Sequence, residues 1–161
     1  MGDLVTRWTI RIALVLYVAS LASRDWSRRW SRLAWTAGCG FYLLHVALAF
    51  EFFHQWSHVE AYAATARQTA QVVGLDWGGG LYVNYAFTLV WFADALWWWV
   101  SVESHSHRSR FLAWALDGFM GFIAFNATVV FARGWSRWFG IAACVGLAML
   151  WFFGRAAARK R

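Results

Sequence analysis

The sequence predicts an all-α integral membrane protein, a bundle of five antiparallel transmembrane helices. Of its 161 residues, 61% are hydrophobic and only 14% are charged, whereas about 25% of residues are charged in ordinary soluble domains. The apolar residues gather in five stretches, each close to the roughly 17–25 residues that cross a bilayer as a helix. The 14 tryptophans gather near the ends of these stretches, and amphipathic rings prefer the headgroup level.

The expected spans follow one another along a single domain, residues 1–161. They cover residues 8–23, 34–53, 81–102, 111–131 and 137–153. Three of the four connections between them are short, which favours antiparallel neighbours. The chain contains no proline, so none of these helices carries a proline kink.

Basic residues set the expected orientation. Ten of the 15 lysines and arginines fall on the side that holds the first connection, the third connection and the C-terminus. These ten are Arg24, Arg28, Arg29, Arg32, Arg108, Arg110, Arg155, Arg159, Lys160 and Arg161. Because positive charge is retained on the cytoplasmic side, we expect the N-terminus outside and the C-terminus inside, in a bacterial-type plasma membrane. The net charge of +7 is then explained by the lipid bilayer as partner rather than by nucleic acid.

The second connection differs from the others, because residues 54–73 have the pattern of an amphipathic helix. No helix-breaking residue occurs between Phe41 and Val73, so the second helix is expected to run on outward and to end near Gly74. One stripe is apolar and consists of Trp56, Val59, Ala63, Ala66, Ala70 and Val73. A roughly opposite stripe is polar and consists of Glu51, His54, His58, Tyr62, Thr65 and Thr69. This segment is expected either to stand above the bilayer or to lie on it.

The most specific candidate for chemistry begins that extension. Glu51, His54 and His58 lie at positions i, i+3 and i+7 and therefore share one helix face. A carboxylate with two imidazoles suits a transition metal, and we expect Asp76, Asn84 or Asn126 to complete the site. The alternative is that the two histidines are simply solvated at the membrane surface.

Ionisable side chains inside the apolar spans are a second set of candidates, because burying them in lipid is costly. They are Arg11, His45, Asp94 and Asp117. Asp94 and Asp117 fall at matching depths in neighbouring helices and are expected to pair in the bundle interior. His45 as a haem ligand would need Met120 or Met149 opposite it, so haem is the less favoured cofactor. His105 and His107 are expected to be juxtamembrane polar residues.

These observations leave three functions open. The first is a small membrane protein with an outward-facing polar site that binds a metal or a polar ligand. The second is a non-catalytic accessory subunit of a larger membrane complex, with other membrane subunits as partners. The third is a proton or ion pathway through the intramembrane carboxylates. No complete catalytic set supports an enzyme, and the nucleophile motif Gly-x-Ser-x-Gly is absent from the sequence.

Overall fold

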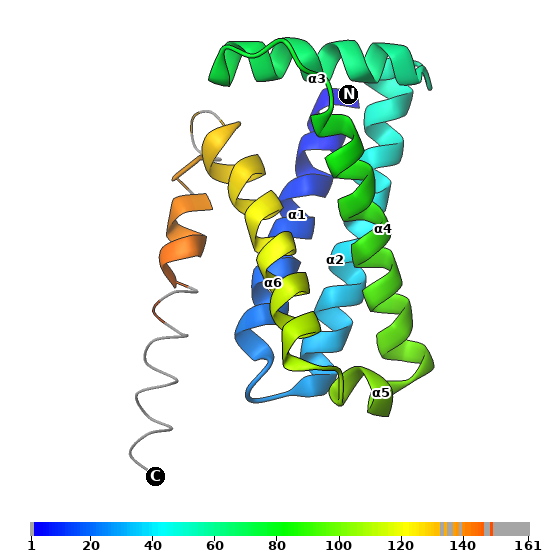
Figure 1. Cartoon of the computed structure of the whole chain (residues 1–161), viewed down its shortest axis with the longest axis vertical. Helices are drawn as coiled ribbons and strands as arrows, with labels where there is room; N and C mark the ends of the chain where they lie inside the picture. Colours follow the sequence, from blue (N-terminus) through cyan, green and yellow to red (C-terminus); the bar gives the residue numbers. More distant parts are fainter. Residues whose placement is uncertain (1, 133, 135–136, 139, 147–148, 150–161) are drawn as a thin grey trace.

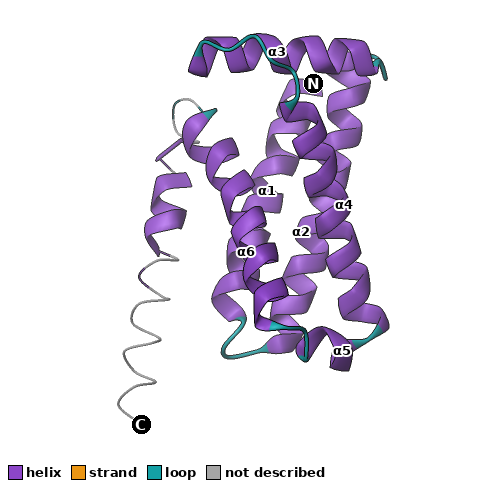
Figure 2. Ribbon diagram, in the orientation of Figure 1, coloured by secondary structure: helices purple, strands orange, loops and turns teal. Residues whose placement is uncertain are grey.

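The computed structural model describes residues 2–132, 134, 137–138, 140–146 and 149, and these residues form helices and no strand (Figures 1 and 2). Three helical segments are long and apolar enough to cross a membrane: Gly2–Ser23, Arg28–His54 and Arg110–Val130. The prediction of an all-α fold is therefore confirmed, and these three segments have the length and hydropathy of membrane spans. The helices are α1 (Gly2–Ser23), α2 (Arg28–Ala49), α3 (His58–Val73), α4 (Gly80–Val100), α5 (Val102–Ser106) and α6 (Arg110–Phe125), with π-helical turns η1 (Phe50–His54) and η2 (Asn126–Val130).

Four helices form an upright bundle, and α3 lies across one end of it (Figure 1). Helix α1 packs on α2, α2 packs on α4, and α4 packs on α6. The short helix α5 and the connection between α1 and α2 lie at the opposite end (Figure 1). We call these two ends the α3 end and the α5 end.

Serine side chains begin four of the helices. Ser27, Ser57, Ser101 and Ser109 each accept a hydrogen bond from a backbone N–H in the first turn of α2, α3, α5 and α6. Such N-caps satisfy one of the backbone donors that a helix start leaves free. The cap at Ser101 explains why the third predicted span ends at Val100 and not at residue 102: the chain turns there to begin α5.

The prediction of an uninterrupted helix from Phe41 to Val73 is wrong. The chain leaves the helix at Gln55 and Trp56, whose φ angles of 48° and 57° are left-handed, a conformation that costs a non-glycine residue about 1–2 kcal/mol. Two local interactions offset this cost: the Trp56 indole donates to the Glu51 carboxylate at 2.7 Å, and Ser57 caps α3. Helix α3 consequently crosses the bundle end and stops at Gly74, which is also left-handed.

An aromatic core fills the middle of the bundle. The indole of Trp91 on α4 lies 5.9 Å from Tyr17 of α1 and 5.4 Å from Trp35 of α2, between ring centroids. Tilted and edge-on contacts of this kind are the favourable arrangements for aromatic pairs. A Cβ added to Gly38 would lie 3.0 Å from the Trp91 ring, so this glycine lets α2 approach α4 closely.

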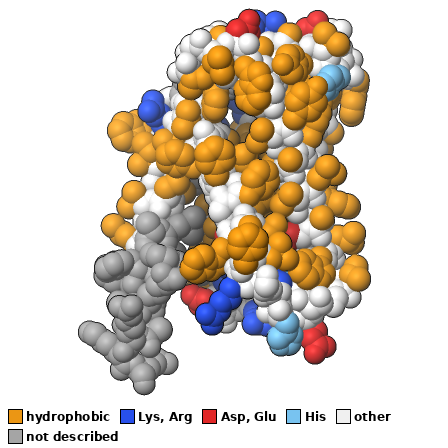
Figure 3. Space-filling model, in the orientation of Figure 1, with side chains coloured by type: hydrophobic (Ala, Val, Ile, Leu, Met, Phe, Trp, Pro, Cys, Tyr) orange, Lys and Arg blue, Asp and Glu red, His pale blue; other side chains and the backbone are white. Residues whose placement is uncertain are grey.

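The sides of the bundle are covered mostly by hydrophobic side chains, and charged side chains gather at its two ends (Figure 3). The described residues between 137 and 149 are helical, and they fall within the fifth predicted span. The remainder of that span, residues 150–153, lies outside the described residues, as do the four basic residues at the C-terminus.

Candidate functional site

The structure separates the three residues of the predicted metal site. Glu51 lies in η1, and its carboxylate accepts the hydrogen bond from Trp56. The His54 ring packs edge-on against Phe50, with 5.6 Å between centroids. His58 lies beyond the left-handed bend, so the face that a continuous helix would have shared is broken between His54 and His58.

His58 joins α3 to α4 instead. Its Nδ1 lies 3.1 Å from the hydroxyl of Tyr85, and its Nε2 lies 3.4 Å from the hydroxyl of Tyr82. Among the residues that the structure describes, no group of three His, Cys, Asp or Glu side chains could hold a metal ion. The α3 end therefore carries a histidine–tyrosine contact where the sequence predicted a metal centre.

The residues expected to complete that centre do not converge on it. Asp76 and Asn84 are exposed. The Asn126 side chain donates to the backbone carbonyl of Phe122, one turn earlier in its own helix, at 2.8 Å. This bond satisfies the amide locally and gives it no role between helices.

Two of the intramembrane candidates have structural partners. His45 lies 2.9 Å through Nδ1 from the carbonyl oxygen of Thr6, and because a carbonyl only accepts, the ring donates from Nδ1. It thereby ties α2 to α1. Arg11 is exposed on α1, and its guanidinium lies 5.3 Å from the centroid of the Trp8 ring.

The two carboxylates that were expected inside the membrane, Asp94 and Asp117, have arginine partners and do not pair with each other as predicted. Arg108, in the connection after α5, donates to Asp94 at 3.1 Å. Arg24, after α1, donates to Asp117 of α6 at 2.7 Å. Like charges at close range repel, whereas an adjacent guanidinium favours the ionised carboxylate. Each arginine thus stabilises a carboxylate inside an otherwise apolar helix.

The Asp94 cluster is almost completely enclosed. The side chains of Asp94 and Arg108 are 8% and 13% exposed, and His105 of α5 is buried beside them. Arg108 approaches Nε2 of His105 at 2.6 Å. Nε2 also lies 3.3 Å from Asp94 Oδ1. Nε2 accepts from Arg108 in the tautomer with the proton on Nδ1, and it donates to Asp94 in the tautomer with the proton on Nε2. The imidazole is stacked on Trp98, with 4.5 Å between centroids and 11° between planes.

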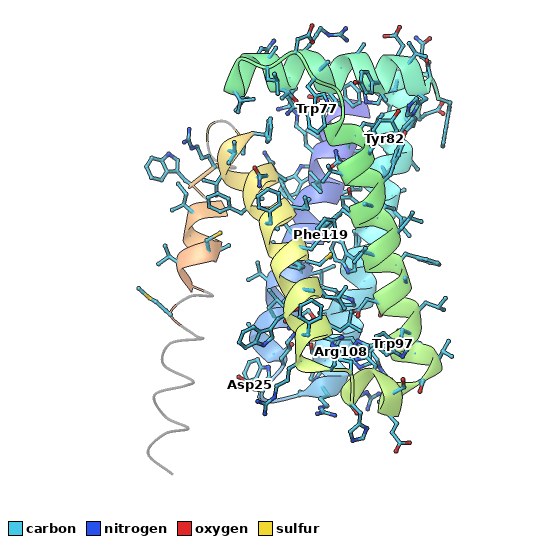
Figure 4. All side chains as sticks on the ribbon, viewed as in Figure 1. Asp25, Trp77, Tyr82, Trp97, Arg108 and Phe119 are labelled. Carbon is cyan, nitrogen blue, oxygen red and sulfur yellow. The ribbon has the colours of Figure 1, made fainter. Side chains whose placement is uncertain are left out.

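Arg24 and Arg108 border a cavity of about 210 Å³ at the α5 end. Figure 4 places Arg108, Asp25 and Trp97 together at this end, far from Trp77 and Tyr82 at the other. The cavity is lined by side chains from α2, α4 and α5 and from the connections after α1 and α5: Arg24, Arg28, Ser31, Trp98, His105, Ser106 and Arg108. Three guanidiniums offer hydrogen-bond donors to this cavity, and such an arrangement can bind an oxyanion such as a phosphate. The hydroxyls of Ser31 and Ser106 donate instead to the backbone carbonyls of Ser20 and Glu103.

This site was not predicted from the sequence. Arg24, Arg28 and Arg108 were interpreted only as signals of the membrane orientation. His105 was expected to be a juxtamembrane residue, whereas it is buried. One signal could have found it. A carboxylate in each of two apolar spans requires a cation, and the nearest cations are the arginines of the adjoining connections.

Comparison with known proteins finds no matching family, no matching curated protein and no matching solved structure. The function is therefore argued from the geometry alone.

Proposed function

We propose that the chain crosses the membrane five times, with the N-terminus outside, the C-terminus inside, and the amphipathic helix α3 at the outer surface. Helix α4 supports this topology: it is 21 residues long, has Asp94 as its only charged residue, and lies within the bundle (Figure 1). Its tryptophans and tyrosines lower its mean hydropathy, although their rings are well suited to the membrane interface. The arginines at the α5 end support a cytoplasmic position for that end.

Cysteine labelling in intact cells tests this topology. In a variant with Cys39 and Cys144 replaced by alanine, Gln68→Cys on α3 is expected to react with a membrane-impermeant maleimide. His107→Cys, in the connection after α5, is expected to react only after the membrane is permeabilised. Both positions are exposed, so reactivity after permeabilisation serves as the control for each. Labelling of His107→Cys in intact cells would reverse the orientation.

We propose that the protein binds an oxyanion of the phosphate class in the cavity at the α5 end. The observation that carries this proposal is the convergence of Arg24, Arg28 and Arg108 on one cavity. Carboxylates hold two of the arginines by single nitrogen atoms, which fixes the guanidiniums and leaves their other N–H groups to donate. Such fixed donors bind an anion at a low entropic cost.

Arg28 supplies the third charge and has a different role. It is exposed, and it has no ion-pair partner among the residues that the structure describes. Removing its charge therefore leaves no buried carboxylate without a partner. A change at Arg28 is expected to weaken the binding of an anion without unfolding the protein.

Calorimetric titration of the purified protein with inorganic phosphate, in a neutral detergent at low salt, tests the oxyanion proposal. A charge-assisted hydrogen bond contributes about 1.5–3 kcal/mol, so Arg28→Gln is expected to raise the Kd roughly tenfold or more. The matched control is Arg67→Gln on α3, an exposed arginine at the other end, which should leave the Kd unchanged. No saturable phosphate binding by the wild-type protein, or equal Kd values for wild type and Arg28→Gln, would contradict the proposal.

The three functions that the sequence left open stay predictions. A polar ligand at the α3 end would meet His58, Tyr82 and Tyr85, whose ring nitrogens and hydroxyls contact one another. The oxyanion proposal is the stronger one, because its arginine donors line one cavity and come from distant parts of the chain.

A further inference from the structure

We infer that the oxyanion is the headgroup phosphate of an anionic phospholipid, one acyl chain of which lies in a groove between α2 and α4. This inference rests on the proposed oxyanion site. It adds a second binding surface, an apolar one, on the side of the same two helices. The protein would then hold one anionic lipid molecule at its cytoplasmic side.

The groove is an open, apolar cavity of about 240 Å³. Helix α2 contributes Thr36, Cys39, Gly40 and Leu43, and helix α4 contributes Phe92, Ala95, Leu96 and Trp99. A Cβ added to Gly40 would meet no atom within 4 Å. The missing side chain at Gly40 therefore leaves space along the groove that a hydrocarbon chain can occupy.

Arg32 connects the groove with the basic cavity. It lies one turn after the cavity residue Arg28 on α2, and i and i+4 positions are neighbours on a helix surface. Its guanidinium lies 4.1 Å from the centroid of the Trp99 ring, and Trp99 lines the groove. The Trp99 indole in turn donates to the hydroxyl of Thr36 at 2.8 Å. A cationic group thus stands at the end of the groove that faces the cavity.

The Arg32 guanidinium has a donor that the described protein does not use. Its Nε is buried and has no hydrogen-bond partner among the described residues. Arg32 also forms no ion pair among the described residues, so its positive charge beside the groove is not neutralised by a carboxylate. Charge and shape therefore favour the same occupant: an anionic headgroup beside Arg28 and Arg32, with its chain against Gly40.

The surroundings of the site match the level of lipid headgroups. Trp26 and Trp30, in and just after the connection between α1 and α2, are exposed, and tryptophan is enriched at this level of a bilayer. Basic pockets between transmembrane helices on the cytoplasmic side are suited to anionic headgroups. A soluble phosphate would use only the cavity, whereas a phospholipid would use both the cavity and the groove.

The test compares three probes on the purified protein in neutral detergent: dioctanoyl phosphatidylglycerol, dioctanoyl phosphatidylcholine and inorganic phosphate. A chain held in the groove raises the effective concentration of its headgroup at the arginines. Phosphatidylglycerol is therefore expected to bind roughly tenfold more tightly than inorganic phosphate, and more tightly than the zwitterionic phosphatidylcholine.

The variant Gly40→Phe separates the groove from the basic cavity. It fills open space, so it is expected to fold, and it should lower the affinity for phosphatidylglycerol to that for inorganic phosphate without changing the latter. The variant Arg32→Gln is expected to weaken phosphatidylglycerol binding roughly tenfold, the effect of one lost charge-assisted bond. Thermal unfolding of both variants is the control for folding.

Three results would overturn the lipid inference while leaving the oxyanion proposal intact. They are equal affinities for phosphatidylglycerol and inorganic phosphate, equal affinities for the two lipids, and a Gly40→Phe variant that folds and binds phosphatidylglycerol like the wild type. If neither inorganic phosphate nor phosphatidylglycerol binds, both proposals fail.

Discussion

Replacing Arg108 with alanine is expected to lower the free energy of unfolding by about 3–5 kcal/mol, because it leaves a buried carboxylate without its cation. The carboxylate is Asp94, whose side chain is 8% exposed and lies 3.1 Å from the guanidinium. His105 Nε2 would remain 3.3 Å from the carboxylate, and one imidazole contact replaces the lost guanidinium only in part. Unfolding by SDS titration in mixed micelles measures the change.

Two further variants separate the stability cost of an unpaired buried charge from the cost of lost packing. The double variant Asp94→Leu with Arg108→Met removes both charges, and replacing a buried pair by apolar residues is often neutral. It is therefore expected to recover most of the lost stability. Arg7→Ala breaks a shorter ion pair, 2.8 Å from Asp3, but these side chains are 66% and 59% exposed, so the expected loss is below about 1 kcal/mol. A loss of similar size in Arg108→Ala and Arg7→Ala would contradict the buried-charge argument.

Replacing Trp91 with alanine is expected to cost about 3–5 kcal/mol, the usual range for removing a large aromatic side chain from a core. The ring contacts Tyr17, Trp35 and Phe87, so α1, α2 and α4 would all lose packing. The same SDS titration measures the loss. Trp114→Ala is the matched control, because that ring is 72% exposed on α6 and its loss should change stability by less than about 0.5 kcal/mol.

Trp91→Phe refines this prediction. The Trp91 indole N–H is buried without a hydrogen-bond partner among the described residues, and an unpaired buried donor costs about 1–3 kcal/mol. Replacing the indole by a phenyl ring lowers the packed volume but also removes the unpaired N–H donor. The loss is therefore expected to be less than half of that for Trp91→Ala. If Trp91→Phe is as damaging as Trp91→Ala, the two effects do not offset each other in this way.

The helices were largely predictable because hydrophobic length and serine caps are local signals. Residues 111–131 were expected to span the membrane, and the structure has a helical segment Arg110–Val130. The bend at Gln55 and Trp56 was not predictable in the same way. Neither residue is a helix breaker, and the interactions that stabilise the bend are the side-chain contacts of Glu51 and Ser57.

The predicted metal site does not form among the described residues, for a related reason. The motif Glu51, His54 and His58 shares a face only if the helix continues through Gln55, and it does not. The basic cavity, by contrast, depends on contacts between distant parts of the chain: Arg24 and Asp117 are 93 positions apart. Helical periodicity cannot show which arginine lies beside which carboxylate, although it does show that each carboxylate needs one.

The most direct test of the central claim, that the α5 end binds a phosphate group, is an experimental structure of the protein with phosphatidylglycerol in a lipid nanodisc. We expect headgroup density within hydrogen-bonding distance of Arg28 and at least one of Arg24 and Arg108. Density there with the chain elsewhere would support the oxyanion site alone. A cavity filled only by water, with the arginines in the same ion pairs, would contradict the claim.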